Sequence, residues 1–348
     1  MIELLLCTLI WGASFVAQKL GADHFGPFSM TCYRNLLAVV FLWGCILVRD
    51  RFASRVKAEL GTTRLRVGWT RPAIVGGALS GVCVFAAELT QQLGIERTSP
   101  GVSAFLTANY VLLVPVFGIF LGRRAGLGVW GGVMLALAGT FLICFSMEDL
   151  RRETLDLGTG EAWTLLCAAL FAVQIMVVDR FVGGCDMLRF SMVQMGVAGL
   201  VSLPFVFLPG ELARTSWTGF VSGIPALLFL GVLSSGVAYT LQNLGQAKVP
   251  AALASIIMSL EGTFAALFGW LILGDVLSSR QLLGCALVFG AVILSQLCNR
   301  SLPASKPNSP IGRQDRYDRI AKAESEIDAG LGIDARESLR RTRARIHG

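Results

Sequence analysis

The chain has 348 residues, of which 54% are hydrophobic and only 15% are charged, and its mean hydropathy is +0.65. A soluble domain carries about a quarter charged residues, so this composition excludes an ordinary water-soluble core and favours a protein of the lipid bilayer. The formal net charge of +7 would point to nucleic acid in a soluble protein. In a membrane protein the side on which the charges lie is more informative than their sum.

Ten apolar segments are each long enough to cross a bilayer as a helix. In chain order they cover about residues 2–20, 28–48, 72–93, 101–121, 127–146, 161–181, 188–208, 218–242, 251–273 and 279–298. The sequence therefore predicts an all-α membrane protein with ten transmembrane helices.

Lysine and arginine are concentrated in alternate connections between these segments. With the N-terminus in the cytoplasm, 23 of the 30 fall on one side, most of them between Arg49 and Arg71 and in the tail after Asn299. The opposite side receives an acidic connection over residues 147–160. The positive-inside rule then predicts that both termini are cytoplasmic and that the chain is a multi-pass protein of the cell inner (plasma) membrane.

A long repeat divides the membrane region into two halves, residues 1–146 and 161–298. Leu-Gly and Pro landmarks of the first half recur in the second at an offset of 150 to 152: Leu93-Gly94, Pro100 and Leu121-Gly122 become Leu244-Gly245, Pro250 and Leu273-Gly274. Near the start of each half the offset is 160, which places Gln194 at the position of Arg34. Because five helices is an odd number, the second half must be inverted relative to the first (5+5), as in secondary transporters. Chance similarity between apolar helices is the alternative.

The tail over residues 299–348 has a different composition. It begins with three prolines and then alternates acidic and basic residues, with Tyr317 as its one aromatic residue. Such a segment cannot bury a core, so we expect a charged, largely disordered cytoplasmic tail, with or without a short surface helix over 314–328.

Residues that carry catalysis or hold cofactors are scarce. The chain has only two histidines, His24 and His347, its nine cysteines include no C-x-x-C pair, and no phosphate-binding loop or nucleophile motif occurs. We therefore expect no enzyme activity, no cofactor, no metal site, no nucleic-acid partner and no ATP hydrolysis.

Charged residues within apolar segments need an explanation, because each costs about 2.5–3.5 kcal/mol on insertion scales. Glu261 lies ten residues after Ala251, or about 15 Å along a helix, which is near the midplane. It could contact substrate or take up protons, or it could be a neutral carboxyl hydrogen-bonded to neighbouring helices. Arg34 and Glu88 both lie about 8–9 Å below the outer boundary, so we expect an ion pair. That pair could be a gate or a static brace.

Polar and aromatic side chains fall at similar depths on several helices. With the charged residues above, those that we expect to face a substrate cavity are Trp11, Gln91, Asn109, Tyr110, Tyr239 and Gln242. Amides and hydroxyls around a cavity suit an uncharged or zwitterionic solute, although each of them could instead bridge two helices.

Several motifs together carry a family resemblance: the run Leu-Ile-Trp-Gly-Ala-Ser-Phe (9–15), Arg34, Pro100, Pro115 and the segment 259–270. On these residues the sequence resembles the EamA-type branch of the drug/metabolite transporter superfamily, over about residues 2–298. The resemblance implies an inverted 5+5 bundle with a central cavity lined by the first four helices of each half. Two positions depart from the family pattern: Arg123 stands where an acidic residue is common, and Gly262 follows Glu261 in place of proline.

The sequence thus predicts a secondary transporter that exports small metabolites such as amino acids by alternating access. One alternative is a proton-coupled exporter of lipophilic cations that uses Glu261, and another is a non-transporting membrane receptor. The expected partners are a small-molecule substrate and the lipid bilayer. Small residues spaced by four (Gly128, Gly132, Ala136) favour close packing within the bundle and leave a homodimer as an alternative.

Overall fold

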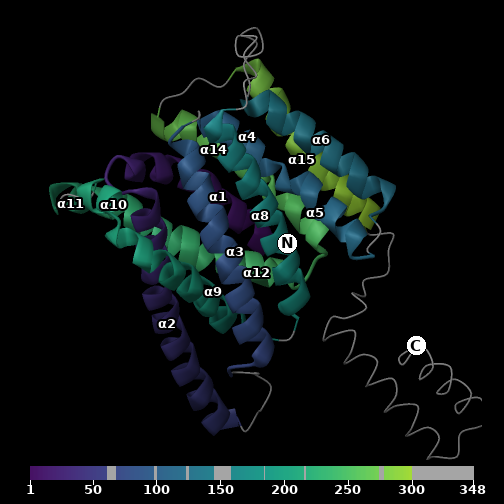
Figure 1. The fold of residues 1–348 in the computed structure, drawn as a ribbon. Helices are drawn as coiled ribbons and strands as arrows, with labels where there is room; N and C mark the ends of the chain where they lie inside the picture. Colours follow the sequence, from purple (N-terminus) through teal and green to yellow (C-terminus); the bar gives the residue numbers. More distant parts are fainter. Residues whose placement is uncertain are drawn as a thin grey trace, which may run out of the picture. The chain divides into compact units, whose positions relative to one another are not determined.

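The computed structural model describes residues 1–60, 68–97, 100–122, 125–144, 158–183, 185–214, 217–273 and 278–299. Every regular element within these ranges is helical (Figure 1). Most of the predicted acidic connection 147–160, and the predicted tail beyond Asn299, lie outside the described residues.

The helices follow the ten predicted segments in order. The first half contains α1 (Ile2–Ala22), α2 (Pro27–Leu60), α3 (Arg71–Ile95), α4 (Pro100–Ala108), α5 (Tyr110–Phe120) and α6 (Leu127–Cys144). The second half contains α8 (Thr159–Phe181), α9 (Met187–Ser202), the 3₁₀ turn η1 (Leu203–Phe207), α10 (Pro209–Arg214), α11 (Trp217–Leu228), the π-helix η2 (Phe229–Ala238), α12 (Tyr239–Gln246), α13 (Ala251–Met258), α14 (Leu260–Phe268), the π-helix η3 (Gly269–Leu273) and α15 (Ser279–Asn299).

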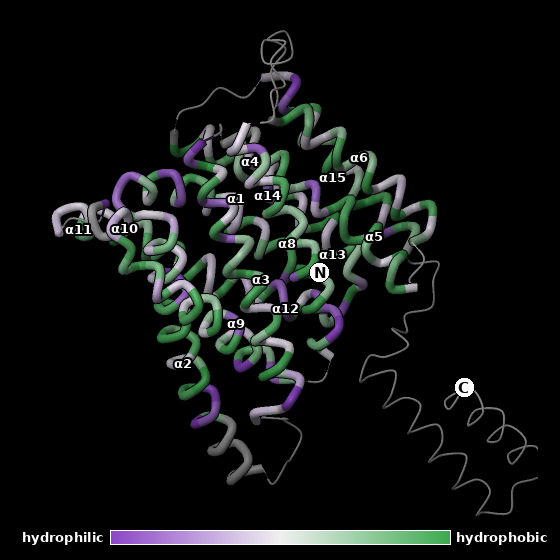
Figure 2. Tube along the Cα trace, viewed as in Figure 1, coloured by the Kyte–Doolittle hydropathy of each residue, from purple (hydrophilic) through white to green (hydrophobic). Residues whose placement is uncertain are grey.

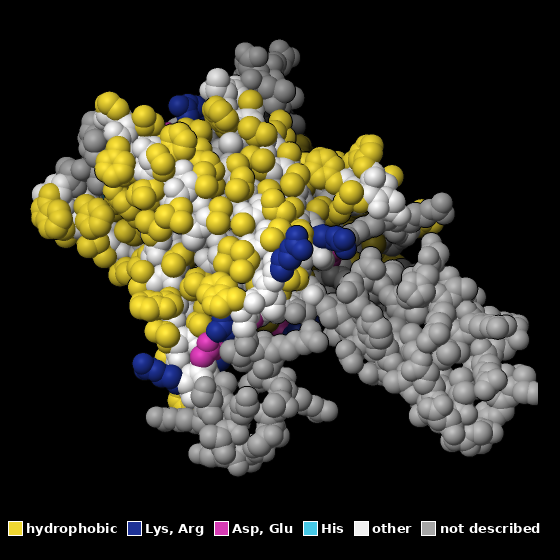
Figure 3. Space-filling model, turned by 60° about the horizontal axis from the view of Figure 1, so that its bottom comes forward, with side chains coloured by type: hydrophobic (Ala, Val, Ile, Leu, Met, Phe, Trp, Pro, Cys, Tyr) yellow, Lys and Arg dark blue, Asp and Glu magenta, His cyan; other side chains and the backbone are white. Residues whose placement is uncertain are grey.

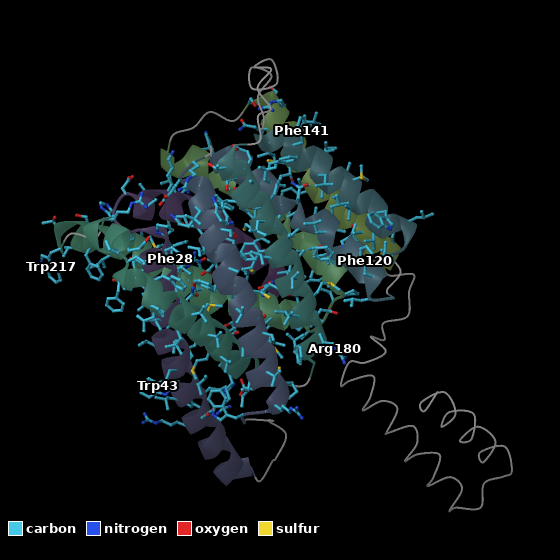
Figure 4. The ribbon with its side chains drawn as sticks, viewed as in Figure 1. Phe28, Trp43, Phe120, Phe141, Arg180 and Trp217 are labelled. Atoms are coloured by element: carbon cyan, nitrogen blue, oxygen red, sulfur yellow. The ribbon has the colours of Figure 1, made fainter. Side chains whose placement is uncertain are left out.

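Nine helical stretches of the described residues are long and apolar enough to cross a membrane, and α6 adds a shorter apolar helix. The helices are hydrophobic along most of their length, with hydrophilic residues near several of their ends (Figure 2). Large apolar side chains cover the face shown in Figure 3, with charged groups near its margins. Trp43, Phe120 and Trp217, which are 57%, 82% and 79% exposed, point away from the bundle (Figure 4). This surface suits contact with lipid.

Two features of the helices differ from the sequence prediction. The connection expected from Arg49 begins later, because α2 continues to Leu60 through a stretch rich in good helix formers. The fourth and ninth predicted helices are each interrupted, at Asn109 and at Ser259. These two interruptions are 150 residues apart and so obey the repeat.

Glycines of the repeated Leu-Gly pairs make equivalent contacts in the two halves. A Cβ atom at Gly94 of α3 would overlap Thr164 of α8, and one at Gly245 of α12 would overlap Leu4 of α1. Since Thr164 follows Leu4 by 160 residues and Gly245 follows Gly94 by 151, each contact is the counterpart of the other. The Leu-Gly pairs recur because glycine lets these helices approach closely.

Helices α2 and α9 show the same exchange where they cross. A Cβ at Gly199 would lie 2.9 Å from Leu36, and one at Gly196 would lie 3.7 Å from Val39. Gly196 follows Leu36 by 160 residues, and Gly199 follows Val39 by 160, so each contact is the repeat counterpart of the other. The two halves are thus joined at this crossing as a two-fold axis would join them.

Helices α6 and α15 lie side by side, as Figure 1 also shows. The predicted small-residue face of α6 packs here: Gly128 lies against Cys298 and Gly132 against Ser295. At Gly139 the two backbones approach so closely that a Cβ would lie 2.6 Å from the carbonyl oxygen of Gly284. These glycines serve contacts within the chain, as the spacing favoured.

We predict that Gly139→Val lowers the unfolding temperature of the detergent-purified protein, because the new side chain must displace backbone. The free-energy loss expected from overpacking is about 1–3 kcal/mol. Gly131→Val is the matched control on the same helix, since a Cβ there meets only Leu294 Cδ2 at 3.5 Å. Equal unfolding temperatures for the two variants would contradict this account of the α6–α15 contact.

Candidate functional site

A cavity lies among the described helices of both halves. It contains about 490 Å³ of space not filled by atoms, part of which is open to solvent. Its lining comes from α1, α2, α3, α4, α5, α8, η2, α12, α13 and α14. Helix α9 contributes no lining residue among those described, although the resemblance implied a wall from the first four helices of each half.

Eight of the nine predicted site residues line this cavity: Trp11, Arg34, Glu88, Gln91, Tyr110, Tyr239, Gln242 and Glu261. Asn109 is the exception. It lies at the interruption between α4 and α5, where its amide donates to the carbonyl oxygens of Phe105 (3.0 Å) and Leu106 (3.2 Å). The structure therefore gives Asn109 a local backbone contact in place of a cavity position. That the other eight contact substrate stays a prediction.

Aromatic rings form part of the wall. Trp11 and Tyr239 pack edge to face, with ring centroids 5.0 Å apart. Phe171, which is related to Trp11 by the offset of 160, also lines the cavity. Next to Trp11, Gly12 brings α1 against α14, where a Cβ would lie 2.8 Å from the backbone nitrogen of Ala265. The Trp-Gly pair thus supplies both a ring to the cavity and a close contact beside it.

Arg34 and Glu88 form the predicted ion pair, with Arg34 Nη2 3.3 Å from Glu88 Oε1. Both side chains are buried, at 6% and 2% exposure. Asn35 donates to Glu88 Oε2 at 2.6 Å, while Arg34 donates to the hydroxyls of Ser235 (from Nε) and Ser234 (from Nη2), each at 3.0 Å. The pair is therefore held by partners from three elements, α2, α3 and η2.

Gln194 of α9 occupies the position equivalent to Arg34 and is the centre of an uncharged network. It donates to Ser80 Oγ at 2.9 Å and accepts from Asn243 Nδ2 at 2.9 Å. Gln174 and Gln242 adjoin this network, and Gln242 Nε2 donates to Gln174 Oε1 at 3.0 Å. Equivalent positions in the two halves therefore carry an ion pair in one case and neutral amides in the other.

Glu261 lies where the two halves meet. Its Oε1 accepts a 2.9 Å hydrogen bond from the hydroxyl of Tyr110, and the residue is 7% exposed. The two residues are 151 apart, within one residue of the 150 that separates the interruptions at Asn109 and Ser259. No lysine or arginine of the described residues forms an ion pair with Glu261.

A second cluster of charges joins α2 to the start of α9, away from the cavity. Arg49 Nη2 lies 2.7 Å from Asp186 Oδ2, and Arg189 bridges Asp186 (2.6 Å) and Asp50 (2.5 Å). The Arg189 guanidinium also lies over the ring of Trp69, 5.6 Å from its centroid. This network ties the two halves together near one end of their crossing.

The other end of the α2–α9 pair has a corresponding link. Glu211 of α10 accepts hydrogen bonds from the backbone N–H (2.9 Å) and the hydroxyl (2.7 Å) of Ser29. Ser29 and Arg189 are 160 residues apart, and Asp50 and Glu211 are 161 apart. The Ser29–Glu211 contact is therefore the counterpart of the Arg189–Asp50 ion pair.

The geometry, a cavity with charged and amide side chains in its wall that lies between the two repeated halves of an apolar bundle, fits a carrier of small solutes. A family model described as "EamA-like transporter family" matches residues 1–145 and again residues 158–297. The chain belongs to the EamA-like transporter family. It is accordingly a multi-pass membrane protein related to transporters, as the motif in the first helix and the segment 259–270 predicted.

Relatives of this EamA-like transporter come from distant organisms. An uncharacterized transporter of Archaeoglobus fulgidus is 26% identical over 301 residues, which cover 84% of each chain. A chloroplastic WAT1-related protein of Arabidopsis thaliana is 27% identical over 82% of this chain and 66% of its own. The threonine/homoserine exporter RhtA of Escherichia coli is 28% identical over 60% of this chain and 66% of its own.

One solved crystal structure supports the fold of the EamA-like chain. It aligns with a TM-score of 0.65 over 86% of this chain and 98% of its own, at 17% identity.

Sequence reasoning missed several residues of the site. Ser234, Ser235 and Asn35 hold the Arg34–Glu88 pair, and Thr107 lines the cavity beside Tyr110. Single serines, threonines and asparagines are common in apolar helices and carry no distinctive spacing. The exception is the adjacent pair Ser234-Ser235, which lies in the π-helix η2 and bonds one guanidinium through both hydroxyls.

We predict that Arg34→Met lowers the stability of the purified protein by about 3–5 kcal/mol, because Glu88 is left as a buried charge without its cation. Gln194→Met is the matched control at the equivalent position, where loss of neutral hydrogen bonds costs about 1–3 kcal/mol. Unfolding temperatures measure both. If the pair is a brace, exchanging the charges (Arg34→Glu with Glu88→Arg) restores part of the loss, and no restoration would exclude that role.

We predict an acid-dependent loss of stability at Asp186, which lies outside the membrane spans. Burial raises the pKa of its carboxyl, but hydrogen bonds and charge from Arg49 and Arg189 outweigh burial, so the pKa lies below the ordinary 3.8. The stabilisation is therefore present above that ordinary value and is lost as pH falls through the lower, folded-state pKa. The difference in unfolding temperature between wild type and Asp186→Asn should shrink as pH falls from about 6 to about 3. Asp23→Asn, an exposed position, is the control.

Proposed function

We propose that this EamA-family protein is a secondary transporter of the cell inner membrane that exports a small metabolite, such as an amino acid, by alternating access. The observation that carries the proposal is the cavity itself, in which two acidic residues, one basic residue and several amides face a common space inside an apolar bundle. A structural core would not keep so many polar groups around open space.

The proposed topology has ten crossings with both termini in the cytoplasm. Its support is the excess of lysine and arginine on one side of the chain. The exchange of contacts between the halves supports an inverted arrangement, in which the cavity opens to one side and then to the other. The cell inner (plasma) membrane is the proposed location. Labelling of single cysteines tests the orientation.

An amino acid suits the cavity because groups of both signs face it. Arg34 offers donors, Glu261 offers an acceptor without a basic partner among the described residues, and Gln91 and Gln242 offer neutral amides. A zwitterion adds no net charge to such a site. The name of RhtA, a threonine/homoserine exporter, points to the same class of solute.

The contact between α2 and α9 supports a fulcrum for alternating access. Helices α2 and α9 touch at their crossing and are linked at both ends, by Arg189–Asp50 and by Ser29–Glu211. We infer that the halves rock about this seam while α1, α3, α8 and α12 move around the cavity. A gradient would drive the cycle, because the sequence has no nucleotide-binding loop.

A second candidate is a proton-coupled exporter of lipophilic cations. The observation that favours it is Glu261, whose carboxyl faces aromatic and polar walls and has Tyr110 as its hydrogen-bond donor. A carboxylate among aromatic rings can bind either a proton or an organic cation.

The test is uptake by proteoliposomes of purified protein against labelled amino acids and cationic dyes, with and without a pH gradient. We predict amino-acid flux that persists, with reduced rate, in Glu261→Gln. Ser255→Ala is the control, since that hydroxyl bonds only to its own helix. Dye flux that needs both the gradient and Glu261 would establish the second candidate instead. Folded protein that moves neither class of solute would favour a non-transporting receptor.

A further inference from the structure

The eighth predicted helix contains one more residue than its counterpart in the first half. Gly81 packs on Val197, and Gly231 packs on Leu37. Because Leu37 precedes Val197 by the repeat offset of 160, Gly81 and Gly231 are equivalent positions of the two halves. The pairs Gly94–Thr164 and Gly245–Leu4 are equivalent in the same way. Between these landmarks the step from Gly81 to Gly94 is 13 residues, whereas the step from Gly231 to Gly245 is 14.

The additional residue is accommodated by the π-helix. Helix α3 is α-helical throughout the shorter step, and η2 (Phe229–Ala238) occupies most of the longer one. A π-turn holds one residue more than an α-turn, and such turns are frequent at functional sites. The second half has therefore gained a local widening that the first half lacks, in the wall of the cavity.

The two serines that bond Arg34 lie within this widened stretch. Ser234 and Ser235 are adjacent in sequence, yet both hydroxyls accept from the same guanidinium at 3.0 Å. In α3 the corresponding positions carry Cys83, Val84 and Phe85, and no polar pair occurs there. Gln194, the counterpart of Arg34, bonds instead to Ser80, which lies just before the stretch from Gly81 to Gly94.

The two serines leave the Nη1 end of the guanidinium open. The Ser235 hydroxyl accepts from Nε, and the Ser234 hydroxyl accepts from Nη2. Nη2 also lies 3.3 Å from Glu88 Oε1. Nη1 makes no hydrogen bond with any residue that the structure describes, and Arg34 lines the cavity. A guanidinium is a planar fork of five donors suited to carboxylates, so its free end is a site for one.

We propose that Arg34 binds the carboxylate of a zwitterionic substrate, and that Ser234 and Ser235 are positioning residues which the π-helix η2 brings to it. The inference rests on the proposed function and adds the group that is recognised. Glu88 already balances the charge of Arg34, so a simple anion would leave two negative groups sharing one cation. A zwitterion brings its own positive charge and avoids that imbalance.

The experiment compares transport of labelled threonine, glutamine and phenylalanine with transport of their carboxamides, which lack the carboxylate. Wild type should prefer each transported amino acid to its amide. In Ser234→Ala with Ser235→Ala this preference should fall at least about tenfold, mainly through KM, because hydrogen bonds to a charged group are lost. The control is Ser255→Ala with Ser295→Ala, which removes two hydroxyls that bond only to their own helices.

A second variant addresses the π-helix directly. Deletion of Val237 within η2 restores the 13-residue step that α3 spans as an ordinary helix, so the landmark contacts at Gly231 and Gly245 can be kept. We expect a monodisperse protein with an unfolding temperature close to that of the wild type, and loss of the preference for the carboxylate.

The outcomes separate the two proposals. If wild type moves none of the amino acids, the proposed function fails and this inference fails with it. If wild type moves amino acids but moves their amides equally well, the proposed function stands and the carboxylate site is wrong. An unchanged preference in the double serine variant would likewise overturn the role of η2.

Discussion

The constraint on which this structure depends is that lipid neither hydrates a charge nor satisfies a backbone group. Every regular element of the described residues is helical, because a helix satisfies its own backbone. For the same reason Arg34 and Glu88 are partnered by each other and by Asn35, Ser234 and Ser235. Many of the buried polar groups of the described residues are thus partnered inside the bundle, and several of them line the cavity.

Glycine positions follow from the same constraint. Helices in lipid gain little from burying apolar surface against each other, so close contact must supply the attraction. The contacts at Gly94, Gly245 and Gly139 bring neighbouring helices together at equivalent or reciprocal positions. The Leu-Gly pairs that reveal the repeat in the sequence are therefore points of contact between helices. For this reason the spacing of these pairs is the same in both halves, while most other side chains differ.

Much of the fold was predictable for this reason, and part of the site was not. Hydrophobic length located the apolar helices, nine stretches of which among the described residues are long enough to cross a membrane, and matched depth on consecutive helices identified the Arg34–Glu88 pair. Asn109 bonds to backbone at an interruption and does not line the cavity, because helical depth does not determine which way a side chain turns there. The π-helix and its serines were missed because a single additional residue changes hydrophobic length hardly at all. It becomes visible only when contacts fix the register of both halves.

The pairing of Tyr110 with Glu261 has a thermodynamic consequence for transport. The two residues stand within one residue of equivalent positions of the repeat and touch each other, so the proposed exchange of conformations between the halves would return the pair close to the same place. In the proposed alternating-access cycle, their contribution to substrate affinity would then be nearly equal in the two orientations of the cavity. A difference in affinity between the two sides of the membrane would have to come from positions that are not equivalent, and Arg34, whose counterpart is the neutral Gln194, is one of these.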